Sequence, residues 1–187
     1  MSILPQSSVA VFARHVIALC RFRGDPQDII YSPALLVLLL LATSAIDALG
    51  GALLGDALDA LARSLFASVV ILGLCGVALA VHGLRNRYVQ TATALLATGI
   101  VVSLVQLPIL GLLGPLVDAG TLSSTDIAWN LLQILLRWAG LATLVWQALV
   151  YAHIVRHAMD SRFGFALALV VTWFVANWAL AGLLLDA

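Results

Sequence analysis

The sequence predicts an all-α membrane protein, a bundle of five transmembrane helices preceded by an N-terminal amphipathic helix. The first observation is composition: 63% of the 187 residues are hydrophobic and only 10% are charged, and the mean hydropathy is +1.11. Soluble domains carry about 25% charged residues, and disordered chains are also rich in polar and charged residues. Both classes are therefore excluded, and the lipid bilayer is the expected solvent. The second observation is that the apolar residues gather in five runs, each long enough to cross the hydrocarbon core as a helix.

The segment 1–31 precedes the first apolar run and has a different pattern. Apolar side chains recur at helical spacing at Val9, Phe12, Ala13, Val16, Ile17 and Cys20. Arg14 and Arg21 fall on the opposite face. This pattern predicts an amphipathic helix that lies in the cytoplasmic headgroup region, and the alternative is a helix docked against a partner protein. Residues 1–31 are therefore expected to form an interfacial segment, and residues 32–187 the transmembrane domain.

Two short motifs lead from this segment into the first span. Asp25-Pro26 and Ser32-Pro33 each place an N-cap residue before a proline, and proline is favoured in the first helical turn. Gly24 is expected to end the amphipathic helix. The motifs therefore predict a short bridging helix and a first span that begins at Pro33.

Five apolar runs are predicted to span the membrane. They are Pro33–Gly51, Leu65–Val81, Thr91–Leu113, Ile127–Ala152 and Phe163–Leu185. Each is long enough to cross the bilayer with some tilt. The first run lacks the short basic stretch and the small-residue cleavage site of a signal peptide, so it is expected to be a retained helix.

The segments between these spans differ in charge. Seven of the nine arginines belong to alternate segments, namely Arg14, Arg21, Arg23, Arg85, Arg87, Arg156 and Arg162. The intervening segments and the tail carry Asp56, Asp59, Asp118, Asp126 and Asp186, with Arg63 as their one arginine. The positive-inside rule places the arginine-rich side in the cytoplasm, so the N-terminus is expected inside and the C-terminus outside.

All the cations are Arg and all the acids are Asp, a bias that suggests a bacterial genome. The expected location is therefore the bacterial inner membrane.

Polar side chains inside the spans are the first place to look for function, because each is costly to bury in lipid. At a rise of about 1.5 Å per residue, every span contributes one polar side chain at a similar depth, in the outer half of the membrane. This predicted layer consists of Asp47, Ser68, Gln106, Gln133 and Asn177.

Arg137 lies one turn from Gln133 in the fourth span. It belongs to a stripe at helical spacing that is expected to face the bundle interior, made of Asn130, Gln133, Arg137, Gly140, Gln147 and Tyr151. An isolated charge at a helix centre costs about 2.5–3.5 kcal/mol on insertion scales. We therefore expect Arg137 to form an ion pair with Asp47, hydrogen-bonded by the amide side chains of the layer. The layer is either a substrate, ion or proton site or a set of hydrogen bonds between helices. The lack of a second carboxylate favours the structural interpretation.

Histidines form a second group near the inner ends of the spans. His82 ends the second span, and His153 and His157 stand one turn apart at the end of the fourth. Such a trio could ligate a metal ion, and His82 with His153 could hold a haem axially. No Cys or Glu ligand supports this spacing, so the histidines are more simply interpreted as structural. No cofactor or metal is expected.

Other functional classes find no support in the sequence. It contains no nucleophile elbow, zinc-protease motif, glycine-rich phosphate loop or paired intramembrane carboxylates. The predicted loops are too short for a soluble catalytic domain. The formal net charge is zero, whereas a nucleic-acid-binding face needs clustered excess cations. Neither an enzyme nor a nucleic-acid partner is expected.

The junction RGDPQDIIYSP at Arg23–Pro33 joins the amphipathic stretch to an acidic, proline-containing turn, and five spans follow. In this arrangement the chain resembles the bacterial Yip1-domain membrane proteins over most of its length. Its N-terminal part is shorter than in the eukaryotic trafficking members. That family has no established catalytic residues to carry over, so the resemblance implies a membrane adaptor or assembly role.

These features predict a non-enzymatic accessory, scaffold or assembly subunit that works with other membrane proteins or as a homo-oligomer. The first alternative is a small transporter or channel that uses the Asp47–Arg137 layer. The second alternative is a redox subunit that binds haem or metal through His82, His153 and His157.

Overall fold

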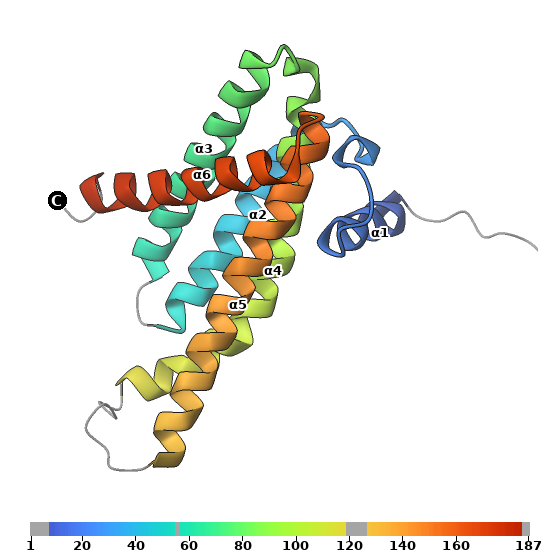
Figure 1. Ribbon diagram of the computed structural model, residues 1–187. Coiled ribbons are helices and arrows are strands. Elements are labelled where there is room, and N and C mark those ends of the chain that lie inside the picture. The colour runs from blue at the N-terminus through green and yellow to red at the C-terminus, as the bar shows by residue number, and fades with distance from the viewer. Residues whose placement is uncertain (1–7, 55–56, 119–126, 185–187) are drawn as a thin grey trace, which may run out of the picture.

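The computed structural model describes residues 8–54, 57–118 and 127–184. In these residues it forms the helices α1 (Ser8–Cys20), η1 (Pro26–Asp28), α2 (Pro33–Ala52), α3 (Ala57–Val81), η2 (Arg85–Arg87), α4 (Tyr88–Asp118), α5 (Ile127–Ala158) and α6 (Phe163–Leu184). Both η elements are single turns of 3₁₀ helix. The helices α2 to α6 are each long and apolar enough to cross a membrane, so the described residues contain five candidate spans, the number that the sequence predicts. Figure 1 shows α2, α4 and α5 side by side, and α6 crosses α3 at a large angle.

The helices extend further than the predicted spans. The second begins at Ala57 instead of Leu65, and the fourth continues past Ala152 to Ala158. A helix does not stop where its apolar run stops, because backbone hydrogen bonds propagate into polar residues at the membrane boundary. Leu185, the predicted end of the fifth span, lies outside the described residues, as do Asp56, Asp126 and Asp186.

The centre of the bundle is α4, which packs against α1, α2, α3 and α5. Every residue from 91 to 99 is buried. Thr93 and Thr98 donate their hydroxyl hydrogens to carbonyls of α4 itself, and Thr91 donates to the carbonyl of Arg87 in the preceding turn η2. These threonines therefore need no partner from another long helix. The alanines between these threonines allow close approach of the neighbouring helices. A run of small, internally satisfied residues therefore makes α4 the common contact surface.

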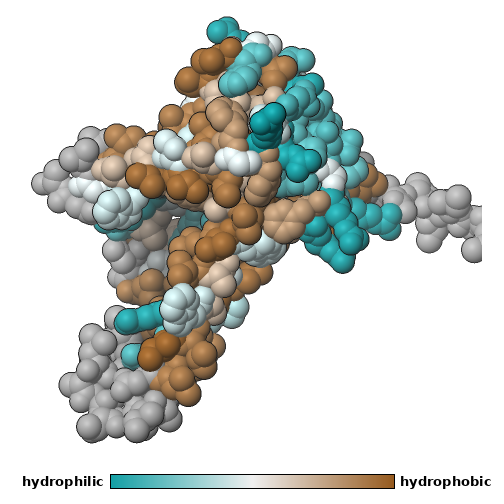
Figure 2. All heavy atoms as spheres, in the orientation of Figure 1, coloured by the Kyte–Doolittle hydropathy of each residue, from teal (hydrophilic) through white to brown (hydrophobic). Residues whose placement is uncertain are grey.

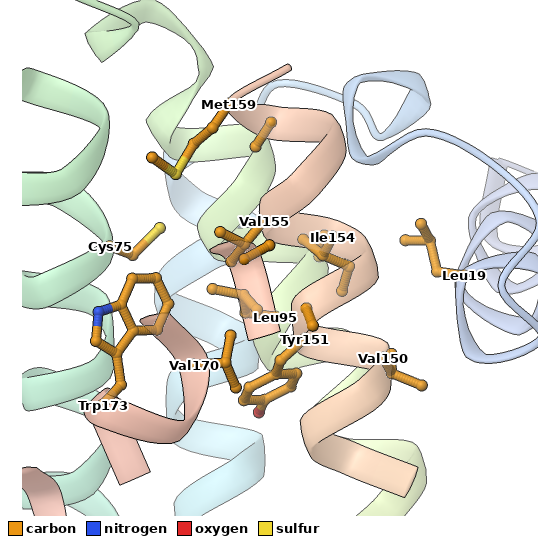
Figure 3. Packing of buried hydrophobic residues seen from close by; sticks show 14 of the residues in the cluster. Leu19, Cys75, Leu95, Val150, Tyr151, Ile154, Val155, Met159, Val170 and Trp173 are labelled. Carbon is orange, nitrogen blue, oxygen red and sulfur yellow. The ribbon is translucent and has the colours of Figure 1, made fainter. Parts of the chain in front are cut away.

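The main hydrophobic cluster joins α3, α5 and α6 (Figure 3). Cys75 of α3, Tyr151 and Val155 of α5, and Trp173 of α6 are all buried in it. The ring of Tyr151 also stacks on Phe174, with their centroids 6.0 Å apart. This cluster attaches α6 to the bundle although α6 crosses it steeply.

The N-terminal segment packs against α4 and α5 of its own chain. The indole Nε1 of Trp146 donates to the carbonyl of Cys20 (3.1 Å), and Nε2 of His153 donates to the carbonyl of Gly24 (3.2 Å). Val16 and Leu19 are buried. The amphipathic stripe is therefore divided. One edge joins the core, and the other, Val9, Ala13 and Ile17, remains exposed.

The predicted starts of η1 and α2 are confirmed by their caps. The Asp25 carboxylate accepts a hydrogen bond from the backbone N–H of Gln27 (2.9 Å), and the Ser32 hydroxyl accepts one from Leu35 (3.2 Å). The predicted end of α1 at Gly24 is wrong. The helix ends at Cys20, because Phe22 already adopts the left-handed conformation (φ 58°) and turns the chain.

The arginine-bearing segments gather at one end of the molecule, which we call the arginine end. It includes the segment after α1 and the α3–α4 and α5–α6 connections, and it forms the hydrophilic surface in Figure 2. A guanidinium nitrogen of Arg87 donates to the Asp160 carboxylate (2.7 Å) and to the carbonyl of Ala158 (3.1 Å). This pair fastens the start of α4 to the end of α5.

Docking of α1 can be tested through its cysteine. Burial raises the pKa of the Cys20 thiol, so little reactive thiolate exists at neutral pH. Trp146→Phe removes the hydrogen bond to the Cys20 carbonyl, and we expect it to speed alkylation of Cys20 by several-fold, measured by peptide mass spectrometry.

Cys75, which is 1% exposed in the main cluster, is the internal control, and its slow alkylation should not change. Equal rates at Cys20 in both proteins would show that this contact does not hold α1 in place.

Candidate functional site: an intramembrane carboxylate

Asp47 lies in the second half of α2 and is the centre of the polar contacts between α2, α3 and α4. Its two carboxylate oxygens accept hydrogen bonds from different helices, one from the Ser64 hydroxyl (2.6 Å) and one from the Ser103 hydroxyl (2.8 Å). The residue is only half-buried, so its carboxylate remains accessible.

The predicted ion pair between Asp47 and Arg137 is wrong. Arg137 is exposed, and within the described part of the chain the ion pairs are Arg63 with Asp59 and Arg87 with Asp160. The helix that carries Arg137 packs mainly on α4 and α6, whereas α2 packs on α3 and α4. The two charges therefore do not meet, although Gln147 and Tyr151 of α5 line the same cavity as Asp47.

The angular position of Arg137 on α5 explains the error. At about 100° per residue, Arg137 lies about 40° to one side of Gln133 and Gln147 lies about 40° to the other. The packed face of α5 is the Gln147 side, where Leu136 is buried and Thr143 is half-buried. The predicted polar stripe of α5 includes residues on both sides of Gln133. Only the Gln147 side is packed, so Arg137 lies at the exposed edge of the stripe.

A cavity of about 100 Å³ lies beside Asp47, between α2, α3, α4 and α5. We call it the serine cavity. Its polar wall consists of Thr43, Asp47, Ser64, Ser68, Ser103, Gln147 and Tyr151. A cavity of this size has room for a few water molecules, since each occupies about 30 Å³ in the liquid.

A second cavity, of about 250 Å³, lies on the other side of Asp47 and is called here the glycine cavity. It is lined by Gly50 and Gly51 of α2, and by Gln106 and Leu110 of α4, among others. Along both helices these residues are further from the arginine end than those of the serine cavity. The two cavities are therefore stacked along the bundle, and Asp47 and Ser103 line both.

Tyr151 closes part of the serine cavity at the level of Gly99. The amide of Gln147 donates to its hydroxyl (3.2 Å). A Cβ at Gly99 would lie 2.9 Å from that hydroxyl, so glycine is required there for the tyrosine to reach its position. This pair places a hydroxyl and an amide toward the arginine end of the cavity.

The remaining members of the predicted layer divide into two groups. Ser68 lines the serine cavity and Gln106 the glycine cavity, and the Gln106 amide donates to the Thr143 hydroxyl (3.0 Å). Gln133 is buried in α5. Asn177 lies on the steeply crossing α6, where its buried amide oxygen has no hydrogen-bond partner among the described residues. The structure therefore brings only part of the layer to Asp47.

Sequence reasoning missed the two serines that bond Asp47. Ser64 lies one turn before Ser68 on the same face of α3, and Ser103 lies one turn before Gln106 in α4. The signal was present in these polar pairs at helical spacing. Selecting one polar residue per span by depth chose the wrong member of each pair.

The three histidines do not form the ligand trio that the sequence offers as an alternative. Nδ1 of His82 donates to the carbonyl of Ala78 in its own helix (2.9 Å), and the ring lies near Phe165 of α6. His153 is buried under the loop at Gly24, and His157 donates to the carbonyl of His153 (2.8 Å). Among the residues placed by the structure, no group of three His, Cys or Asp side chains could hold a metal ion.

No family model matches this sequence, and no curated protein or solved structure shows detectable similarity to it. The class that the fold defines is a five-helix multi-pass membrane protein. The resemblance to Yip1-domain proteins stays a prediction.

Crowding at Gly99 gives a stability test of the cavity wall. Gly99→Ala should displace the Tyr151 hydroxyl and destabilise the protein by about 1–3 kcal/mol, the usual cost of overpacking. The measurement is thermal unfolding in mild detergent.

Gly73→Ala is the matched control, because a Cβ at this helical position in α3 meets no atom within 4 Å, and the substitution should be neutral or stabilising. Adding Tyr151→Phe to Gly99→Ala should restore part of the loss. If Gly73→Ala and Gly99→Ala behave alike, the Tyr151 wall is not as described.

Proposed function

We propose that this protein binds a small monovalent cation, the proton included, at Asp47 and passes it between the serine and glycine cavities. It would then act as a small transporter or channel. The observation that supports this most directly is that one carboxylate lines both of two stacked cavities. Ionisable residues inside membrane helices mark ion and proton pathways because burying them in lipid is otherwise unfavourable.

The chemistry of the walls supports a small cation as the ligand. Around Asp47 the polar groups are hydroxyls and amides, and no cationic side chain lines either cavity among the described residues. Oxygen ligands suit hard cations such as sodium. An organic substrate of more than a few heavy atoms exceeds the volume of the serine cavity.

The serines give Asp47 two binding modes. A hydroxyl both donates and accepts, so Ser64 and Ser103 can donate to the free carboxylate and turn a lone pair toward a bound cation. When the ligand is a proton, the carboxyl becomes a donor itself, and either serine oxygen can accept from it.

The orientation in the membrane is part of this proposal. We infer that the arginine end faces the cytoplasm, with the N-terminus inside and the C-terminus outside, in a bacterial inner membrane. The exposed edge of α1, formed by Val9, Ala13 and Ile17, suits the headgroup region beside Arg14. The serine cavity then faces the cytoplasm and the glycine cavity faces the opposite side.

Ion flux through Asp47 can be measured in proteoliposomes that contain a pH-sensitive or a sodium-sensitive dye. We expect the wild-type protein to carry protons or sodium, and Asp47→Asn to reduce that flux to the level of empty vesicles. Asparagine preserves the shape but removes the charge. Its Oδ1 can accept from one serine, and its Nδ2 can donate to the hydroxyl oxygen of the other.

Two variants control this experiment. Asp59→Asn removes a carboxylate that pairs with Arg63 at the protein surface and should leave flux unchanged. Ser103→Ala removes a hydrogen bond to Asp47 and should reduce flux. Its control is Ser44→Ala, which removes a hydroxyl that donates only to a carbonyl of its own helix and should leave flux unchanged. A folded Asp47→Asn protein with wild-type flux for both ions would refute the proposal and leave Asp47 a structural role.

A second proposed function is an accessory or assembly subunit for other membrane proteins. It is favoured by the outer half of α5, where Arg137 is exposed among apolar side chains. Purification in mild detergent should recover a defined partner in fixed stoichiometry, whereas a lone monomer would contradict this role.

A further inference from the structure

The face of α5 around Arg137 combines an exposed charge with exposed apolar side chains. Ile134, Trp138, Leu141 and Leu144 surround Arg137 and are 51%, 65%, 48% and 50% exposed. We call these five residues the Arg137 face. Figure 1 shows that the start of α5 extends past the end of α2 and the start of α3.

Arg137 has no hydrogen-bond or ion-pair partner among the described residues, although it lies within the apolar helix α5. It stands about 15 Å along the helix axis from Ile127, the first residue of α5. A guanidinium carries five N–H donors and stays charged. Charged side chains within membrane spans pair with one another or face a protein interior.

We propose that the Arg137 face binds a transmembrane helix of a partner protein that carries an aspartate or glutamate at the depth of Arg137. This inference rests on the accessory role proposed above and adds the chemistry of the partner. The carboxylate would receive a two-pronged hydrogen bond from the guanidinium. The apolar side chains at i, i+4, i+7 and i+10 from Ile134 would pack along the partner helix.

Charge decides against a second copy of this chain on the same face. A two-fold dimer presents the same patch from both subunits, which would bring two Arg137 side chains together without a carboxylate. The acid of this chain at a similar depth, Asp47, is already bonded to Ser64 and Ser103 behind α4. Among the described residues, no free carboxylate at this depth can supply the complementary charge, and we therefore assign it to another protein.

The test uses the full chain in phosphatidylcholine vesicles and a synthetic Leu/Ala helix of about 20 residues, the length that spans the hydrocarbon core. The peptide carries one Asp, or Leu in the control peptide, at the depth of Arg137. Energy transfer between labelled protein and peptide measures binding. We expect the Asp peptide to bind at least about tenfold more tightly than the Leu peptide.

Arg137→Leu should abolish this preference, and Arg137→Asp should transfer it to a peptide that carries Lys. Arg156→Leu removes an exposed arginine at the other end of the same helix and should leave the preference intact. Helix content by circular dichroism confirms that each variant is folded.

Equal binding of the Asp and Leu peptides to the wild-type protein would overturn the proposal. Two other results would also overturn it. In one, labelled copies of this chain show energy transfer between each other that is lost in Arg137→Leu. In the other, the peptide binds only when the vesicles contain anionic lipid, whether or not Arg137 is present. If a partner co-purifies equally with Arg137→Leu and with the wild-type protein, the accessory role stands and this inference fails.

Discussion

A carboxylate inside a membrane-spanning helix must find its hydrogen-bond donors within the protein, because hydrocarbon supplies none. In this chain Asp47 finds them in Ser64 of α3 and Ser103 of α4, so one side chain ties three helices together. The buried run 91–99 of α4 allows the helices to come close enough for these hydrogen bonds, because its small residues leave room for the neighbouring helices. The same packing leaves a cavity on each side of the carboxylate. Asp47 is therefore both a structural link between helices and a polar point at which two cavities meet.

Most of the fold could be predicted from the sequence, because the signals that determine it are local. Apolar runs separated by arginine- or aspartate-bearing segments located the five spans, and Ser32-Pro33 located the start of α2 through a cap that the structure retains. The steep crossing of α6 could not be predicted. It depends on how Trp173 and Val170 pack against α3 and α5, a tertiary contact with no signature in the hydropathy of α6 alone.

The candidate site was predicted only in part, because depth along a helix is easier to read from sequence than rotation about its axis. Of the predicted layer, Asp47, Ser68 and Gln106 line the two cavities. Arg137 was placed inside the bundle, although a rotation of about 40° from Gln133 suffices to expose it. Which side of α5 is buried depends on where α4 and α6 pack, and a single sequence does not contain that information. The two charges inside the spans therefore have separate roles: Asp47 faces the cavities and Arg137 faces outward.

Infrared difference spectroscopy of the protein in lipid tests the central claim most directly, because it observes the Asp47 carboxyl group itself. The expected result is a carboxyl band that shifts when sodium is added or when the pH is changed, and that is missing from Asp47→Asn but present in Asp59→Asn. A band assigned to Asp47 that responds to neither sodium nor pH would contradict the claim. In that case the carboxylate would serve only to hold α2, α3 and α4 together.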